Sequence, residues 1–323
     1  MIKLQPVAFE SMGVRSMCCL VETPDLSVLF DAGVSLGQRF SLAPHPLEYM
    51  ALADARKRIR ELAKKADIVT VSHYHFDHFT PPFRSDTVWT WSSKEEAEAI
   101  YGGKRILAKD ARENINYSQR KRGWIFRNLV GPIAKSIEEA DGKTFKIGGT
   151  ELKFSPPLSH GEEGSELGYV LTVTFKNEGE TVTIAPDVQG PISDDALYYL
   201  ERCESDILVL GGPPTYLAQS KLQEAAFERG FRNMSKLVAI TQLTIVDHHL
   251  LRDAEWRQKA SEVFLVAKTS SKKVQTAAEY LGLNDNLLEA LRKNLYEREP
   301  PSEEFMAWTR LPLEKRRRTM PPL

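Results

Sequence analysis

The sequence predicts a layered α/β fold, and three observations carry the prediction. Short apolar runs typical of strands alternate with a stretch at helical spacing through the first third of the chain. Strand signals return in "KTFKIGGTELKFSPP", "GYVLTVTFKN", "ETVTIAPD", "DILVL" and "LTIV". Six of the seven histidines follow or lie near such runs. This order predicts a rigid scaffold of strands that carries its chemistry in the loops at strand ends.

The first elements are a pair of strands, a helix and a third strand. "SMCCLVET" and "LSVLFDAG" are apolar runs separated by "PD", which predicts two neighbouring strands joined by a tight turn. Residues 48–66 place apolar side chains at helical spacing with charges between them, as in a surface helix. The β-rich run "DIVTV" then ends just before a group of histidines.

The rest of the chain is expected to complete one domain, residues 1–323. Residues 93–140 contain helical, basic and aromatic stretches and are interpreted as a helical insertion. Residues 254–323 are interpreted as a helical C-terminal extension, with a basic, proline-flanked tail. No internal repeat and no low-complexity linker divides the sequence.

Composition excludes several classes of protein. The net charge is −1, so the chain is not a polycation of the kind that binds nucleic acid over its whole surface. Three cysteines are too few for a disulfide framework, and Cys18 and Cys19 are expected to be small buried side chains. No stretch approaches the ~20 apolar residues that span a bilayer. We therefore expect a soluble, cytoplasmic protein.

The sequence "SHYHFDH" is the strongest functional signal. His73, His75, Asp77 and His78 are four ligand-type residues within six positions. Imidazole and carboxylate groups together suit zinc, iron or manganese. The alternative is a solvated polar loop, which this spacing makes less favoured. The motif therefore predicts half of a metal site.

Further imidazoles and carboxylates occupy similar places elsewhere. His160 follows "FSPPLS", His248 and His249 follow "LTIV", and Asp31 and Asp187 follow "VLF" and "TIAP". Each has a simpler reading taken alone: Asp187 could be a turn residue after a proline. His45, between two prolines, is expected at the surface. Their shared position after strands is what makes the others candidate ligands.

At this point the sequence resembles a known family. "SHYHFDH", with "FDAG" upstream and "SHG", "APD" and "DHH" downstream, is similar to the metallo-β-lactamase-fold hydrolases, and most similar to an archaeal branch of uncharacterised members. The resemblance covers residues 31–249. It implies a four-layer αββα sandwich that binds metal ions at one edge of its two sheets.

The resemblance also implies a role for each candidate. His73, His75 and His160 would hold one ion, Asp77, His78 and a late histidine would hold a second, Asp187 would bridge them, and Asp31 would orient the histidine loop by hydrogen bonds. His248 is preferred as the late ligand, and Asp247 is taken as structural. His249 is either a proton donor to the leaving group or a structural hydrogen-bond partner. Asp77 and His249 are thus the candidate catalytic residues.

The predicted activity is hydrolysis by a hydroxide shared between two divalent ions, with zinc as the first choice and manganese or iron as alternatives. No G-x-S-x-G motif or Walker-type loop suggests another mechanism. Di-iron redox members of the family usually carry glutamate at the position of His75, which argues against redox chemistry here. A metal- or nucleic-acid-binding protein without catalysis is the alternative from another class.

The substrate prediction depends on residues 104–127. This segment holds eight basic residues and two acids, with Tyr117, Trp124 and Phe126 among them. It could guide a phosphate-bearing substrate or contact nucleic acid, although a solvated basic face is the preferred reading. A phosphoester or phosphodiester is the first substrate prediction, followed by a thioester, lactone or amide. The oligomeric state is left open by the sequence.

Overall fold

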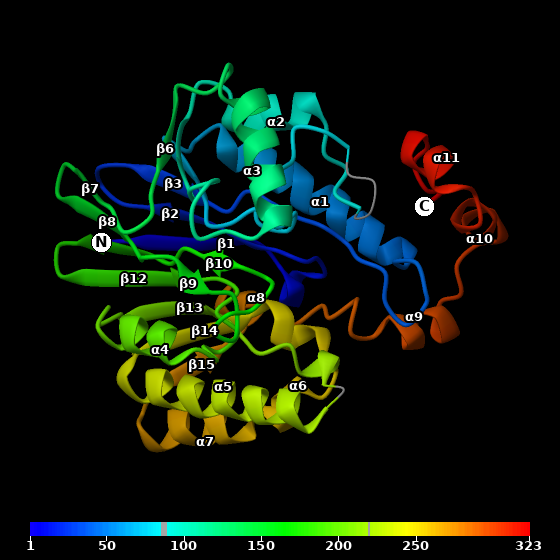
Figure 1. Cartoon of the computed structure of the whole chain (residues 1–323). Coiled ribbons are helices and arrows are strands. Elements are labelled where there is room, and N and C mark those ends of the chain that lie inside the picture. The colour runs from blue at the N-terminus through cyan, green and yellow to red at the C-terminus, as the bar shows by residue number, and fades with distance from the viewer. Residues whose placement is uncertain (85–88, 219) are drawn as a thin grey trace.

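Two β-sheets pack face to face at the centre of the protein (Figure 1). The computed structural model describes residues 1–84, 89–218 and 220–323. The first sheet has its strands in sequence order, antiparallel from β1 to β3 and parallel from β3 to β6. Its strands are β1 (Lys3–Phe9), β2 (Met17–Glu22), β3 (Ser27–Phe30), β4 (Ile68–Val71), β5 (Arg105–Ala108) and β6 (Ser136–Glu139).

The second sheet has the order β15-β14-β13-β12-β11-β8-β7. Strands β12 to β15 run parallel to one another, and β7, β8 and β11 join them in antiparallel pairs. Its strands are β7 (Thr144–Ile147), β8 (Thr150–Phe154), β11 (Val173–Asn177), β12 (Glu180–Ala185), β13 (Ile207–Gly211), β14 (Leu243–Asp247) and β15 (Lys273–Gln275). A separate pair, β9 (Leu158–Ser159) and β10 (Tyr169–Val170), lies beside it.

Helices cover the outer face of each sheet. The first sheet is covered by α1 (Pro46–Ala63), α2 (Lys94–Tyr101) and α3 (Tyr117–Val130), and the second by α4 (Asp194–Glu201), α5 (Lys221–Ile240) and α7 (Ser261–Thr269). The shorter helices are α6 (Trp256–Lys259), α8 (Ala277–Tyr280), α9 (Arg292–Arg298), α10 (Glu303–Thr309) and α11 (Leu313–Arg318). The result is a four-layer αββα sandwich, which confirms the predicted fold class.

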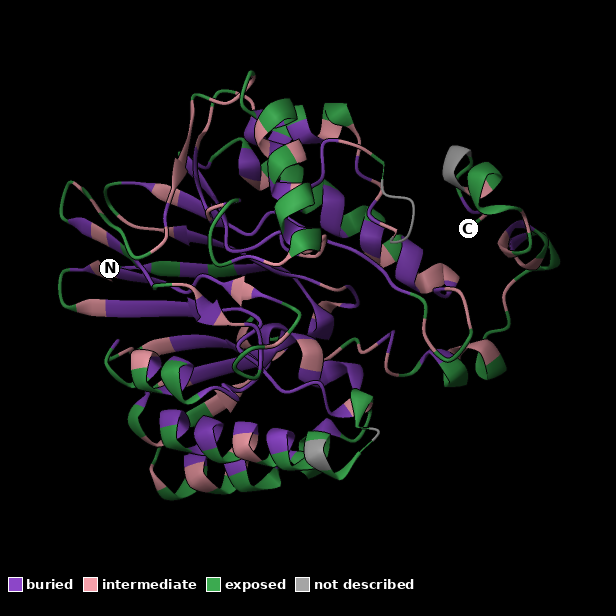
Figure 2. Cartoon of the chain, viewed as in Figure 1, coloured by how far each residue is buried: buried purple, intermediate pink, exposed green. Residues whose placement is uncertain are grey.

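Three apolar layers explain this stacking. Strand β2 is buried on both faces: Cys18 and Leu20 pack toward the helices, while Met17, Cys19 and Val21 pack toward the other sheet. A third layer joins the second sheet to its own helices. Figure 2 shows the same pattern, with buried strands at the centre and helices exposed only on their outer sides. As expected, the cysteines are free and buried.

The interpretation of residues 93–140 as a helical insertion is wrong. The segment contains α2 and α3, but it also supplies β5 and β6, which extend the first sheet beyond β4. Residues 254–323 are likewise not only helical, because β15 pairs with β14 at the edge of the second sheet. Both segments are therefore parts of the sandwich. Among the described helices, none is long and apolar enough to cross a membrane.

His45 is also not where the sequence placed it. Its side chain is buried and caps α1: Nδ1 accepts a hydrogen bond from the Leu47 amide, and the Glu48 carboxylate accepts one from the His45 amide. These two bonds satisfy amide groups that have no partner within a helix. His45 is thus a structural residue at the start of a helix.

Buried ion pairs tie the C-terminal segment to the body of the protein. Arg292 donates to both carboxylate oxygens of Glu48, each at 2.7 Å. Arg15 donates to both oxygens of Glu289 at 2.6 and 2.7 Å. Burial alone would raise the pKa of Glu289, but the charge of Arg15, with those of Arg252 and Arg292, outweighs it and lowers that pKa to about 2.

Candidate metal centre

The ligand-type residues converge at one edge of the two sheets. Asp31 follows β3, and His73, His75, Asp77 and His78 follow β4. From the second half of the chain, His160 follows β9, Asp187 follows β12, and His248 and His249 follow β14. Strands from both sheets thus deliver these side chains to a common place, as the sequence predicted.

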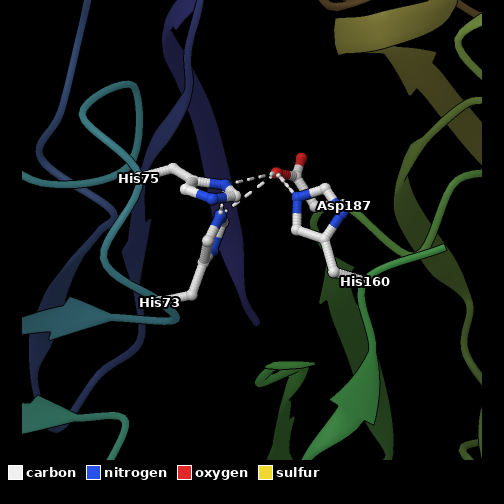
Figure 3. A group of neighbouring side chains, drawn as sticks. All are labelled: His73, His75, His160 and Asp187. Atoms are coloured by element: carbon white, nitrogen blue, oxygen red, sulfur yellow. Dashed lines mark hydrogen bonds and ion pairs between the residues drawn. The ribbon is translucent and has the colours of Figure 1, made fainter. Parts of the chain in front are cut away.

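The first set of candidate ligands surrounds one oxygen of Asp187 (Figure 3). Asp187 Oδ2 lies 3.1 Å from His73 Nε2, 3.9 Å from His75 Nδ1 and 2.8 Å from His160 Nε2. Four atoms, one from each residue, lie within 4.8 Å of one another. Three imidazole nitrogens and a carboxylate oxygen at this spacing could hold one metal ion.

The second set surrounds the other oxygen of the same carboxylate. Asp187 Oδ1 lies 2.9 Å from His248 Nε2 and 3.4 Å from His78 Nε2, and these two nitrogens are 3.3 Å apart. Asp77 Oδ2 lies 3.8 Å from His248 Nε2. Asp77, His78 and His248 form a second group of ligand atoms within 4.8 Å. One aspartate therefore faces two candidate metal positions at once.

The hydrogen bonds of this cluster are incomplete. Asp187 Oδ1 and His160 Nε2 are buried and make no well-directed hydrogen bond in the part of the chain that the structure describes, although each has a polar atom within 3 Å. Unpaired buried polar atoms are costly, and in a native structure they call for an explanation such as a bound ion. Burial lowers the pKa values of His73 and His75, which favours the neutral imidazole that a metal needs. The donor set therefore fits bound divalent metal.

Backbone strain marks the same positions. Asp31, Asp187 and His248 have φ values of 46°, 34° and 66°, in the left-handed region that favours glycine. Strained conformations of this kind persist where the surrounding structure holds them, and they cluster at functional sites. Three loops of the candidate centre share the feature.

Asp31 orients the loop after β4 that carries His73, His75 and His78, called here the histidine loop. Its carboxylate accepts a hydrogen bond from the Ser72 amide at 2.8 Å, a second from the Ser72 hydroxyl, and faces His78 Nδ1 at 2.8 Å. The Nε2 atom of His78 is thereby turned toward Asp187. A carboxylate behind a candidate ligand imidazole fixes the tautomer and the orientation of the ring.

The two neighbouring histidines are in different surroundings. His248 contacts Asp187 closely, and its Nδ1 lies 2.8 Å from Glu10 Oε2. His249 Nε2 is 3.6 Å from Asp187 Oδ1, and its Nδ1 is 3.4 Å from the Tyr216 hydroxyl. His249 forms a further candidate group with Asp187 and His248, but only His248 is also close to Asp77 and His78.

Asp247 has the structural role expected of it. Its carboxylate accepts hydrogen bonds from the amides of Ser11, His248 and Ala277. Burial raises the pKa of Asp247 to about 6, and the group points away from the cluster toward the backbone.

The sequence did not predict two buried charges behind the second ligand set. Glu10 follows β1 and accepts a hydrogen bond from Arg252 Nε at 2.5 Å as well as facing His248. Arg252 also reaches Asp77 Oδ2 at 3.4 Å and the Tyr216 hydroxyl at 3.2 Å. Glu10 could have been found, because it follows an apolar run just as Asp31 does. No pattern in the sequence around Arg252 marked it as part of the site in the same way.

The basic segment 104–127 is largely neutralised by neighbours. Arg105 pairs with Glu138 at 2.7 Å, and Arg112 with Glu139 at 2.8 Å. Lys109 pairs with Asp141, and Arg127 pairs with Glu139. Lys104 donates a hydrogen bond to the Ala66 carbonyl. These five of the eight basic side chains therefore contact the body of the protein, whereas the preferred reading was a solvated basic face.

The fold and site define a class: a four-layer sandwich protein with a histidine and aspartate cluster, able to hold metal ions, at the edge of its sheets. The chain belongs to the UPF0282 family. A UPF0282 protein of Pyrobaculum arsenaticum is 41% identical over 309 residues, covering 94% of this chain and 98% of the relative. Another, from Pyrococcus abyssi, is 43% identical over 300 residues, covering 92% and 94%. No protein-family model matches the sequence.

Among the solved structures with a similar fold are two of low sequence identity. The metallo-β-lactamase fold protein YhfI from Bacillus subtilis is 14% identical, covers 85% of this chain and 96% of its own, and has a TM-score of 0.46. An isothiocyanate hydrolase from Delia radicum gut bacteria is 18% identical, covers 81% and 92%, and has a TM-score of 0.48. The resemblance to the metallo-β-lactamase fold was expected from the sequence motifs.

Proposed function

We propose that this protein is a metal-dependent hydrolase that binds two divalent ions. The observation that carries the proposal is the position of Asp187, whose two carboxylate oxygens face two separate groups of ligand atoms. A carboxylate so placed suits a bridge between two cations. When bound, the ions would lower the pKa of a water molecule and neutralise negative charge that develops on the substrate.

The protein's own residues divide the remaining tasks. His73, His75 and His160 would hold one ion, and Asp77, His78 and His248 the other, as their grouping supports. Zinc is the first choice for such a donor set, with manganese or iron as alternatives. Asp31 and Glu10 hold His78 and His248 in place through their outer ring nitrogens.

We propose that His249 assists the leaving group as a neutral imidazole that donates a hydrogen bond, because burial, with the charges of Arg252 and His248, lowers its pKa well below the usual value. It lies next to Asp187 without belonging to the second ligand group, and its side chain is 14% exposed, so it borders the open side of the site. The Tyr216 hydroxyl, which accepts a hydrogen bond from Arg252, is the partner of its other nitrogen. This arrangement can orient the ring toward a bound substrate.

A phosphoester or phosphodiester is the proposed substrate, because two adjacent cations can stabilise both the attacking and the leaving oxygen in a displacement at phosphorus. A thioester, lactone or amide is the second candidate. A binding protein without catalysis would hold the ions but give no turnover.

Metal analysis with hydrolysis of bis-p-nitrophenyl phosphate tests the proposal. His75→Ala should reduce metal content and turnover together. The matched control is His45→Asn, since His45 lies outside the site and asparagine also caps helices well; it should keep both. Metal without turnover on phosphate, carboxylate and thioester substrates would favour the binding protein, and wild-type protein without metal would refute the proposal.

A further inference from the structure

Helix α3 is fastened directly onto the histidine loop. Gln119 accepts a hydrogen bond from the Tyr74 amide at 3.1 Å and donates one to the Leu167 carbonyl at 2.6 Å. Gly123 lies so close that a Cβ atom there would be 2.7 Å from the Tyr74 ring. The absence of a side chain at Gly123 is what permits this approach. The helix is therefore held in a fixed position beside the candidate metal centre.

This packing places Arg122 against the two chain neighbours of the candidate ligand His75. Its Nη1 donates to the Tyr74 carbonyl at 3.1 Å, and its guanidinium lies over the Phe76 ring, 4.4 Å from the centroid. Tyr74 and Phe76 are the two chain neighbours of His75. The His75 side chain is 23% exposed, the largest value among the candidate ligand side chains of its set. Arg122 thus lies against the residues that flank the most exposed of these four side chains.

Arg122 differs from the cations of its segment that pair with acids, whereas Lys104, Arg120 and Lys121 also have no carboxylate partner among the described residues. Arg105, Lys109, Arg112 and Arg127 each have a carboxylate within 3.4 Å. Among the described residues 1–84, 89–218 and 220–323, no carboxylate lies within 4.0 Å of Arg122. The one hydrogen bond that Arg122 makes with these residues goes to the Tyr74 carbonyl, which is neutral. The guanidinium carries five donors, so most remain available for a ligand.

Because Arg122 is partly buried, the lack of a carboxylate partner is energetically unfavourable. Burial lowers the pKa of Arg122, and the negative charge of Asp77 acts in the opposite direction. A partly desolvated cation is unfavourable unless an anion compensates it. The Phe76 ring holds the guanidinium plane in place, which reduces the entropy lost when that plane binds a ligand. The site is thus built for a negatively charged group that arrives from outside.

We propose that Arg122 binds the negatively charged group of an anionic ester substrate, next to His75 at the mouth of the metal centre. The inference rests on the proposed hydrolase function and narrows its substrate to esters that carry a phosphate-type anion. Two parallel hydrogen bonds from one guanidinium match the geometry of two phosphate oxygens. Arg122 is thereby a specificity-determining residue.

Binding of inorganic phosphate to metal-loaded protein, measured by isothermal titration calorimetry, tests this role without relying on turnover. Arg122→Gln should weaken phosphate binding about tenfold, as expected for the loss of a charge-assisted hydrogen bond. Arg122→Lys keeps the charge and should lose less. The control is Arg120→Gln on the exposed side of the same helix, which should stay within about twofold of wild type. Metal content should be equal in all four proteins.

Turnover then separates this inference from the proposed function. With bis-p-nitrophenyl phosphate, Arg122→Gln should raise KM about tenfold with little change in kcat, whereas kcat/KM for the neutral ester p-nitrophenyl acetate should stay within about twofold. The proposed role of Arg122 is refuted if phosphate binds the Arg122→Gln protein as tightly as the wild type. It is also refuted if phosphate does not bind the wild-type protein. Weakened phosphate binding in a protein that hydrolyses no ester would support the anion site and refute the hydrolase.

Discussion

Replacing Gly33 with alanine should disturb the metal centre through the backbone alone. Gly33 lies two residues after Asp31, and its position faces the chain at His78 and Phe79. An added Cβ would lie 2.2 Å from the Phe79 amide nitrogen and 2.4 Å from the His78 carbonyl carbon. Ordinary contact begins near 3.4 Å, so the two segments must separate by about 1.2 Å. Ligand distances in metal sites tolerate about 0.2 Å.

The expected result of Gly33→Ala follows from these distances. Overpacking of this kind costs about 1–3 kcal/mol, which lowers the Tm of a chain this long by roughly 2–6 °C. The displaced His78 should weaken binding of the second ion at least tenfold. Thermal unfolding by circular dichroism and metal content by mass spectrometry measure the two effects.

A matched substitution controls for the loss of a glycine. Gly149→Ala places its Cβ 3.7 Å from the nearest atoms, the Asn177 side-chain nitrogen and an Asp25 carboxylate oxygen. Its Tm and metal content should therefore equal those of the wild type. A Gly33→Ala protein with wild-type Tm and two bound ions would refute the idea that close backbone contact positions the histidine loop.

Four further substitutions test residues of the candidate centre and of its support. His248→Ala should lose one ion and activity, whereas His249→Ala should keep both ions and lower kcat; the reverse pattern in metal analysis would exchange their roles. Asp31→Asn should weaken metal affinity about 10–100-fold in a chelator competition, and unchanged affinity would contradict its orienting role. The depressed pKa of Glu289, about 2, means that its carboxylate stabilises the fold by about 3 kcal/mol above pH 4.5 and that this contribution is lost as the pH falls toward 2. Urea unfolding of Glu289→Gln should therefore show reduced stability at pH 7 and a flatter dependence on pH between 4.5 and 2; an unchanged pH dependence would contradict this account.

The sequence was sufficient to place the candidate ligands but not all of the scaffold. His73 to His78, His160, Asp187 and His248 were recognisable because each follows an apolar strand, and strand ends on one side of a sheet lie together. Strand β5, "RILA", was missed because it lies within a basic stretch between helical signals, and β6, "SIEE", because it lacks a buried apolar face. A neighbouring strand, which the sequence does not reveal, supplies their stability.

The residues behind the centre were harder to predict. Arg252 reaches Glu10 across 242 positions of sequence, and nothing near either residue signals the pairing. His45 was misplaced because its local signal, a histidine between prolines, resembles that of an exposed loop. Its burial depends on Glu299, whose carbonyl contacts His45 Nε2 at 2.8 Å from the far end of the chain. Tertiary contacts of this kind are set by the fold as a whole.

Anomalous X-ray diffraction from a crystal grown with zinc or manganese tests the central claim most directly. We expect two peaks ~3.5–4 Å apart, one among His73, His75 and His160 and the other among Asp77, His78 and His248, with Asp187 between them. A single peak, or two peaks that do not share Asp187, would contradict a bridged pair of ions.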